Sequence, residues 1–148
     1  MSTFERDEKH LTLELGHEEY GVPVRNVREI VGALPATPIP GSAHHVLGVV
    51  NLRGKVVPVI DLRVRLGLPA VATGPRSCIV VCQGQSGSLV GLLVDAVVEV
   101  VTVRVADVEP PPAVAGIEVS ALAKVRDRVV ILLDVQQTIG GDANLRAA

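Results

Sequence analysis

Short apolar runs that alternate with polar positions cover most of the first half of the chain. Leu11, Leu13 and Leu15 alternate with polar residues and therefore predict a strand with one buried face. Valine dominates the following segments, and β-branched side chains fit a pleated sheet better than they fit a helix. The strands predicted for this half are residues 11–15, 20–24, 27–31, 46–52 and 55–60.

The second half continues in the same way. Three segments rich in proline, glycine and small residues, 34–42, 69–76 and 110–112, cannot hold a regular ladder and are predicted loops. Many short strands with small turns are typical of compact β-barrels, so an all-β fold is expected. The strands predicted for this half are residues 77–83, 89–94, 97–105, 117–125 and 129–133.

Two aspartates each precede a short helical segment that ends at a glycine. Asp61 is the predicted N-cap of a helix over residues 62–66, and Gly67 is its terminator. Asp134 and Gly140 repeat this arrangement near the end of the chain. A capping role accounts for both carboxylates better than catalysis does.

Two pairs of segments match without gaps and in the same order, which favours two similar halves. Arg53 and Gly67 align with Arg126 and Gly140, each 73 positions further along. Gly21 and Glu29 align with Gly91 and Glu99, each 70 positions further along. The alternative is two unrelated strand pairs that share a valine-rich composition.

The repeat defines an expected domain organisation within the 148 residues. We expect one domain, residues 1–148, built from subdomains at about 11–68 and 77–139, with frayed tails at 1–9 and 141–148. Halves of about 70 residues are marginal by surface-to-volume scaling, so they are expected to share a core.

Residues 53 and 54 connect the predicted strands 46–52 and 55–60. Arginine followed by glycine suits a type II turn without strain, although hairpins prefer the primed turns. Arg53 is either an ordinary exposed turn residue or a cation that faces a partner. Pro58 lacks an amide hydrogen, which predicts that its strand lies at a sheet edge or contains a bulge.

Charge and hydropathy narrow the classes of function. The net charge is −2 and the chain has one Phe, one Tyr and no Trp, so a basic footprint and base-stacking platforms are both missing. A small nucleic-acid-binding barrel is therefore a disfavoured alternative. No segment approaches the ~20 uninterrupted apolar residues that span a bilayer, and residues 1–10 are charged, so a cytoplasmic protein is expected.

Candidate catalytic and metal-binding groups are sparse. The sequence contains no P-loop lysine motif, nucleophile elbow or HExxH motif. Neighbouring strand residues such as His44 and His45 point to opposite faces, which argues against a metal pair. Cys78 and Cys82 lie on one predicted strand with Cα atoms ~13 Å apart, too far to bridge, and are expected to be buried and inert. We expect a binding protein, neither an enzyme nor a metalloprotein.

The sequence GVVNLRGKVVPVIDLR at residues 48–63 resembles the signature hairpin of the CheW-like family of chemotaxis coupling proteins. Further similarity lies at residues 19–22, 27–31, 94–97 and 122–134, so the resemblance spans nearly the whole chain. It implies two packed five-stranded SH3-like β-barrels. His44 and His45 depart from the family pattern, which often has an apolar or aromatic residue there.

The resemblance also implies a function without catalysis or cofactors. Proteins of this family are adaptors that join the regulatory domain of a CheA-type histidine kinase to the cytoplasmic tip of chemoreceptors. The positions matching family interface residues are Val27, Glu29, Asn51 and Arg53, and the receptor hairpin would dock in the groove between the barrels. Service in a non-flagellar chemosensory pathway stays open as an alternative.

Overall fold

The computed structural model describes residues 5–140 and consists mainly of short strands. Two short helices follow two of the hairpins: α1 (Leu62–Arg65) and α2 (Val135–Ile139). Two 3₁₀ turns, η1 (Val24–Asn26) and η2 (Val105–Asp107), lie at the ends of strands. The strands are β1 (Glu8–Leu15), β2 (Glu18–Pro23), β3 (Val27–Gly32), β4 (Val46–Leu52), β5 (Lys55–Asp61), β6 (Cys78–Gln83), β7 (Leu89–Val94), β8 (Ala96–Val103), β9 (Val108–Glu109), β10 (Val119–Val125) and β11 (Arg128–Leu133).

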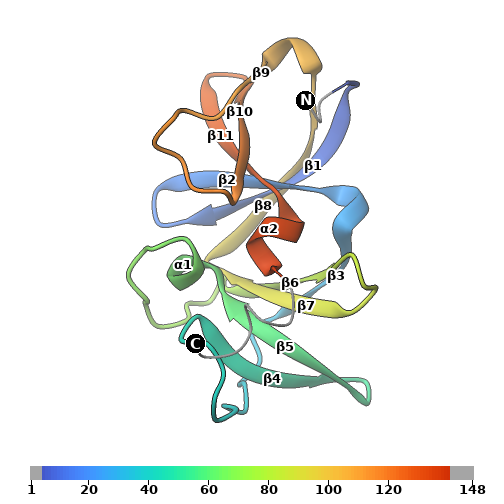
Figure 1. Cartoon of the computed structure of the whole chain (residues 1–148), viewed down its shortest axis with the longest axis vertical. Coiled ribbons are helices and arrows are strands. Elements are labelled where there is room, and N and C mark those ends of the chain that lie inside the picture. Colours follow the sequence, from blue (N-terminus) through green and yellow to red (C-terminus); the bar gives the residue numbers. More distant parts are fainter. Residues whose placement is uncertain (1–4, 141–148) are drawn as a thin grey trace.

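The strands form two sheets stacked along the long axis of the molecule (Figure 1). The upper sheet has the order β8-β1-β2-β11-β10-β9, and the lower sheet has the order β3-β6-β7-β5-β4. Each sheet is antiparallel apart from one parallel pair, β2 with β11 and β5 with β7. The expected all-β class is confirmed.

The two sheets exchange strands between the halves of the sequence. β1 and β2 pair with β8 and β11, whereas β6 and β7 pair with β3 and β5. The pairings of one half therefore recur in the other, as a duplication requires. The predicted subdomain ranges 11–68 and 77–139 do not match the sheets, because each sheet takes strands from both ranges.

The central core lies between the sheets and belongs to both. Leu13 of β1 and Leu92 of β7 are fully buried in one cluster, together with Leu62 of α1 and Ile139 of α2. Each sheet also has a smaller apolar cluster of its own, formed by side chains on its concave face. This arrangement fits the expectation that neither half has a sufficient core of its own.

Both predicted helix caps are present. The Asp61 carboxylate accepts a hydrogen bond from the Arg63 amide at 3.0 Å, and the Asp134 carboxylate accepts one from the Gln137 amide at 3.1 Å. Gly67 and Gly140 have φ angles of 83° and 69°, which favour glycine. The two aspartates thus begin the helices in equivalent ways.

Two expectations about strands need correction. Pro58 lies on β5, which is an inner strand between β4 and β7, so an edge position is wrong, whereas the predicted bulge agrees with the register shift of the β4–β5 pair between Val46 and Gly48. The proline is tolerated because the ladder to β7 begins only at Val59. β1 begins at Glu8, so residues 8 and 9 are not part of a tail. Residues 1–4 and 141–148, where the remaining tails were expected, lie outside the described residues.

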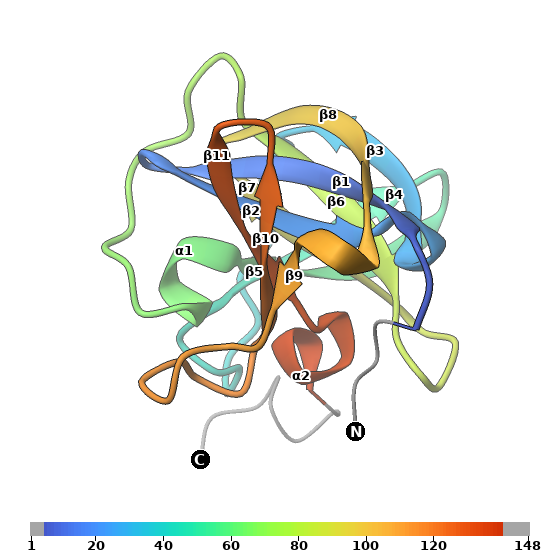
Figure 2. The same cartoon turned by 90° about the horizontal axis from the view of Figure 1, so that it is seen from above.

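Cys82 and the connector agree with expectation, whereas Cys78 is only half-buried. Cys78 and Cys82 are free thiols on β6, and burial raises the pKa of Cys82 to about 12, which keeps it protonated and unreactive. Residues 69–76, the light green loop after α1, run along the outside of the molecule (Figure 2).

Candidate partner-binding surface

The turn between β4 and β5 presents an arginine on a left-handed backbone. Arg53 and Gly54 have φ angles of 51° and 86°, so both central positions are left-handed, as in a type I′ turn. The expected type II turn is wrong, because it would leave Arg53 at negative φ. Asn51 fixes the turn, since its Oδ1 accepts a hydrogen bond from the Gly54 amide at 2.8 Å.

An ion pair joins Arg53 to Glu29 on β3. The hydrogen bond to Glu29 raises the pKa of Arg53, and 73% of the arginine side chain is exposed. β3 forms one edge of the lower sheet and β4 forms the other, so this pair links opposite edges. The sheet is therefore curled into a barrel-like shape at this point.

A hollow of about 340 Å³ lies beside the ion pair. Its charged lining comes from Glu29, Arg53 and Lys55, and its apolar lining includes the buried Val57. Exposed ion pairs contribute little to stability, so the fold gains little from this pair.

The structure brings three of the four predicted interface residues together. Glu29, Asn51 and Arg53 converge on the turn through the two contacts described above. Val27 lies two residues before Glu29 on β3, but it is half-buried and packs against the central core. Its contribution to an exposed surface is therefore the smallest of the four.

A second charged group repeats the first one in the upper sheet. The Arg126 guanidinium donates to the Glu99 carboxylate at 2.9 and 3.3 Å, and Arg126 also has a left-handed φ of 55°. Arg128 adds a further ion pair to Glu99 and one to Glu19 at 2.8 Å. The two gap-free alignments already matched Glu29 with Glu99 and Arg53 with Arg126, so they contained the signal for this group.

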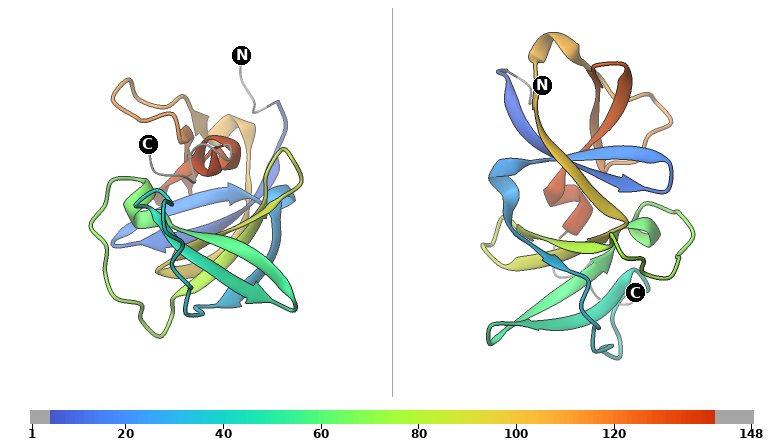
Figure 3. Two further views of the ribbon diagram at one scale, coloured as in Figure 1. Left: turned by 60° about the horizontal axis from the view of Figure 1, so that its bottom comes forward. Right: turned by 180° about the vertical axis from the view of Figure 1, so that it is seen from behind.

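An apolar face lies on the side of the molecule opposite α2. Ile30 on β3 and Val98 and Val100 on β8 are exposed. Both strands face the viewer in the rear view (right panel of Figure 3). The exposed apolar side chains on this side of the molecule therefore come from both sheets.

Within residues 5–140, no group of three or more His, Cys, Asp or Glu side chains could hold a metal ion. The His44 and His45 rings lie edge to face with centroids 6.1 Å apart. None of the helices in this range is long and apolar enough to cross a bilayer.

The fold and the site define a class: a two-sheet β protein whose distinctive features are a charged turn and an apolar face, as in a protein-binding scaffold. Comparison with known proteins gives the family. The chain belongs to the CheW-like domain family, whose model matches residues 9–142. The fold, the charged turn and the signature hairpin are thus all consistent with this family.

Relatives and a solved structure agree with this assignment. The chemotaxis protein CheW of Rhizobium meliloti (strain 1021) is 44% identical over 116 residues, 73% of this chain and 74% of that protein. The chemotaxis protein CheW of Klebsiella aerogenes is 31% identical over 140 residues, 91% of this chain and 83% of that protein. The crystal structure of the scaffolding protein TtCheW from Thermoanaerobacter tengcongensis matches with a TM-score of 0.85 at 31% identity, covering 95% of this chain and 97% of that one.

Proposed function

We propose that this chain is a chemotaxis adaptor that couples the cytoplasmic tip of chemoreceptors to the regulatory domain of a CheA-type histidine kinase. Membership of a scaffolding family supports a role in assembly without a chemical step. The protein would act in the cytoplasm, held at receptor arrays by protein contacts alone. The observation that carries the proposal is the Glu29–Arg53 pair on its left-handed turn.

The kinase-binding surface is assigned to Val27, Glu29, Asn51 and Arg53. Asn51 holds the turn, the turn presents Arg53, and Glu29 orients the guanidinium. A planar guanidinium with several donors is well suited to anchor an interface. The neighbouring hollow, with apolar groups between charged ones, offers a place for an apolar side chain of the kinase.

The receptor-binding surface is assigned to the apolar face of β3 and β8. Its exposed residues Ile30, Val98 and Val100 come from strands that belong to different sheets. A helical hairpin could therefore contact both sheets at once and bury a continuous apolar stripe. Both surfaces include residues of β3, but neighbouring residues such as Glu29 and Ile30 point to opposite faces of a strand, so one small chain can hold two partners.

The test of the kinase surface is a binding titration of the purified kinase regulatory domain by calorimetry. Arg53→Glu should weaken binding at least tenfold, whereas Arg76→Glu, on the connector and similarly exposed at 66%, should not. The swap Glu29→Arg/Arg53→Glu restores an ion pair but reverses its polarity, so it should bind as poorly as Arg53→Glu. Unchanged binding by a folded Arg53→Glu variant would exclude this surface.

The receptor surface has its own test. Val100→Lys should abolish co-sedimentation with a receptor cytoplasmic fragment while leaving kinase binding intact. Val71→Lys provides the matched control, because Val71 is equally exposed but lies on the connector. Equal loss of receptor binding in both variants would contradict the assignment.

A further inference from the structure

The two sheets meet at two junctions that are related by the duplication. We call Gly16, Arg63 and Asp95 the first junction and Arg25, Gln85 and Gln136 the second junction. Arg63 and Gln136 are the second residues of α1 and α2. They are 73 positions apart, and Arg25 and Asp95 are 70 apart, as in the two repeat alignments. The two junctions therefore occupy equivalent places in the fold.

The first junction is filled by a guanidinium. Arg63 donates from Nε to Asp95 Oδ1 at 2.8 Å and from Nη2 to Asp95 Oδ2 at 2.6 Å. The Gly16 amide donates to the same carboxylate at 2.7 Å. Only 15% of the Arg63 side chain is exposed, so this bidentate pair closes the space between α1 and the neighbouring turn.

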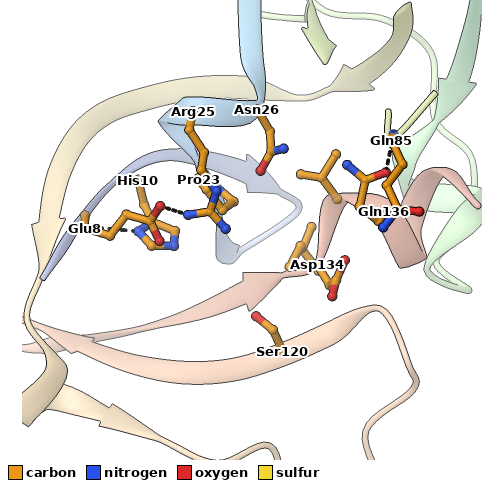
Figure 4. Close-up of a pocket in the computed structure, with 11 residues that line it drawn as sticks. Glu8, His10, Pro23, Arg25, Asn26, Gln85, Ser120, Asp134 and Gln136 are labelled. Atoms are coloured by element: carbon orange, nitrogen blue, oxygen red, sulfur yellow. Dashed lines mark hydrogen bonds and ion pairs between the residues drawn. The ribbon is translucent and has the colours of Figure 1, made fainter. Parts of the chain in front are cut away.

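The second junction is open. Gln136, which replaces the arginine, accepts a hydrogen bond from the Gln85 amide at 2.7 Å and stays beside that turn. Arg25, at the place of Asp95, pairs with Glu8 and not with a residue of α2, and 63% of its side chain is exposed. A cavity of about 330 Å³ remains between these groups, α2 and β1 (Figure 4). This volume lies at the lower end of the ~300–1,000 Å³ range of small-ligand sites.

The charges around the cavity favour a cation. Its lining contains two carboxylates, Glu8 and Asp134, and one guanidinium, Arg25; because Arg25 already pairs with Glu8, the excess negative charge is that of Asp134. His10 is also part of the lining, but burial lowers its pKa to about 4, so it is neutral at pH 7. Asp134 uses Oδ1 to cap α2, and within residues 5–140 its Oδ2 accepts no hydrogen bond.

We propose that this cavity binds the guanidinium group of an arginine side chain presented by a partner polypeptide. The bound group takes the place that Arg63 occupies at the first junction, with Asp134 and Glu8 as acceptors. The cavity shares no lining residue with the hollow beside Arg53. It is therefore a docking point separate from the proposed kinase and receptor surfaces.

The test is an NMR titration of the ¹⁵N-labelled full chain with the peptide acetyl-Gly-Arg-Gly-amide. Saturable shifts are expected at the amides of Asn26, Gln85 and Gln136. The matched peptide with citrulline has nearly the same shape without the charge and should cause no saturable shift. Equal effects of the two peptides, or shifts confined to another surface, would overturn the proposal.

Variants locate the acceptors without disturbing the fold. Asp134→Asn keeps a good N-cap and Glu8→Gln keeps the side-chain shape, and each should weaken arginine-peptide binding at least fivefold. Glu109→Gln removes one negative charge from β9, outside the cavity lining, and should leave binding unchanged. Undiminished binding by Asp134→Asn and Glu8→Gln would contradict the site.

The variant Gln136→Arg tests the same cavity by filling it from within the chain. This variant places a guanidinium in the cavity from within, as Arg63 does at the first junction. It should abolish the peptide-induced shifts and leave kinase and receptor binding intact, which separates the failure of this proposal from the failure of the adaptor function. Persistence of the shifts in a folded Gln136→Arg protein would count against the proposal.

Discussion

At the scale of single residues, both repeats keep an arginine where the backbone favours glycine. Arg53 and Arg126 have φ angles of 51° and 55°, a conformation that costs an ordinary residue roughly 1–2 kcal/mol. An exposed ion pair contributes little to the free energy of unfolding, so it does not offset this cost. The arginine at residue 53 is therefore better explained by the surface it presents than by stability.

Replacement of Arg53 by glycine should separate stability from function. Glycine relieves the left-handed strain and loses the ion pair, so the free energy of unfolding in urea should change by no more than about 1 kcal/mol. Kinase binding should be lost. Lys55→Gly, within β5, is the control and should destabilise the protein by about 0.5–1 kcal/mol. A loss above about 2 kcal/mol for Arg53→Gly would show that the arginine is structural.

The sequence indicated Arg53 as a candidate interface residue but not the backbone conformation that presents it. An Arg-Gly pair is compatible with several turn types, and the twist of the flanking strands selects the primed one. The pairing of Glu29 with Arg53 depends on the curling of the whole lower sheet, which brings its two edges together. Local patterns do not contain that information.

At the scale of elements, the charged group around Glu99 links β8 to β11 in the upper sheet through ion pairs. β1 and β2 lie between β8 and β11 in the sheet order, so Glu99 reaches Arg128 across a curved face. Hydrogen bonds from Arg126 and Arg128 lower the pKa of Glu99 to about 2 from its ordinary 4.5. A carboxylate with a depressed pKa stabilises the folded state above its unfolded pKa.

Acid should therefore weaken the fold in a defined window. The contribution of Glu99 is complete above pH 4.5 and is lost as the pH falls toward 2. The melting temperature of the wild type should drop over this range, and the drop should be smaller in Glu99→Gln. Glu109→Gln, which removes an exposed charge on β9, provides the reference. Identical pH profiles for Glu99→Gln and the wild type would contradict the depressed pKa.

The helix caps provide a second prediction at this scale. Asp61→Ala leaves the Arg63 amide without its acceptor and should cost about 1 kcal/mol of unfolding free energy, measured in urea. Partner binding should be largely unchanged, because Asp61 is buried beneath α1. Asp61→Asn should recover most of the loss, and failure to recover it would show that charge, not capping, matters there.

Most elements could be predicted because their signals are local. Alternating apolar positions rich in valine mark the strands, and an aspartate before and a glycine after a short segment mark each helix. The short strand β9, with two residues, carries no periodic pattern and was missed. Pro58 suggested an edge because a missing donor normally excludes an inner strand. The staggered start of the β5–β7 ladder, which depends on a strand from the other repeat, resolves this conflict.

At the scale of the whole molecule, the exchange of strands makes the halves interdependent. A repeat in the sequence shows which segments are equivalent, but it does not show which copy each strand pairs with. The same alternating pattern would serve a barrel built within one half or across both. The two sheets therefore do not coincide with the two halves of the sequence, although the duplication itself is visible in the equivalent pairings.

Division of the chain at the connector should test this interdependence. The fragments 1–72 and 73–148 should each remain largely unfolded alone, as judged by amide NMR dispersion, because each lacks strands of both sheets. When mixed, they should associate and recover the dispersed spectrum of the intact protein. Independent folding of either fragment would be incompatible with the exchanged topology.

The exchange has an evolutionary consequence. A single ancestral repeat could satisfy its strand edges in this arrangement only as an intertwined homodimer, with two identical interfaces by symmetry. Fusion of two copies into one polypeptide removed that symmetry constraint, so a mutation could thereafter alter one side alone. Arg63 and Gln136 are an example of such a difference between the copies. Arg63 fills the first junction with its own guanidinium, whereas Gln136 leaves the second junction open to a ligand.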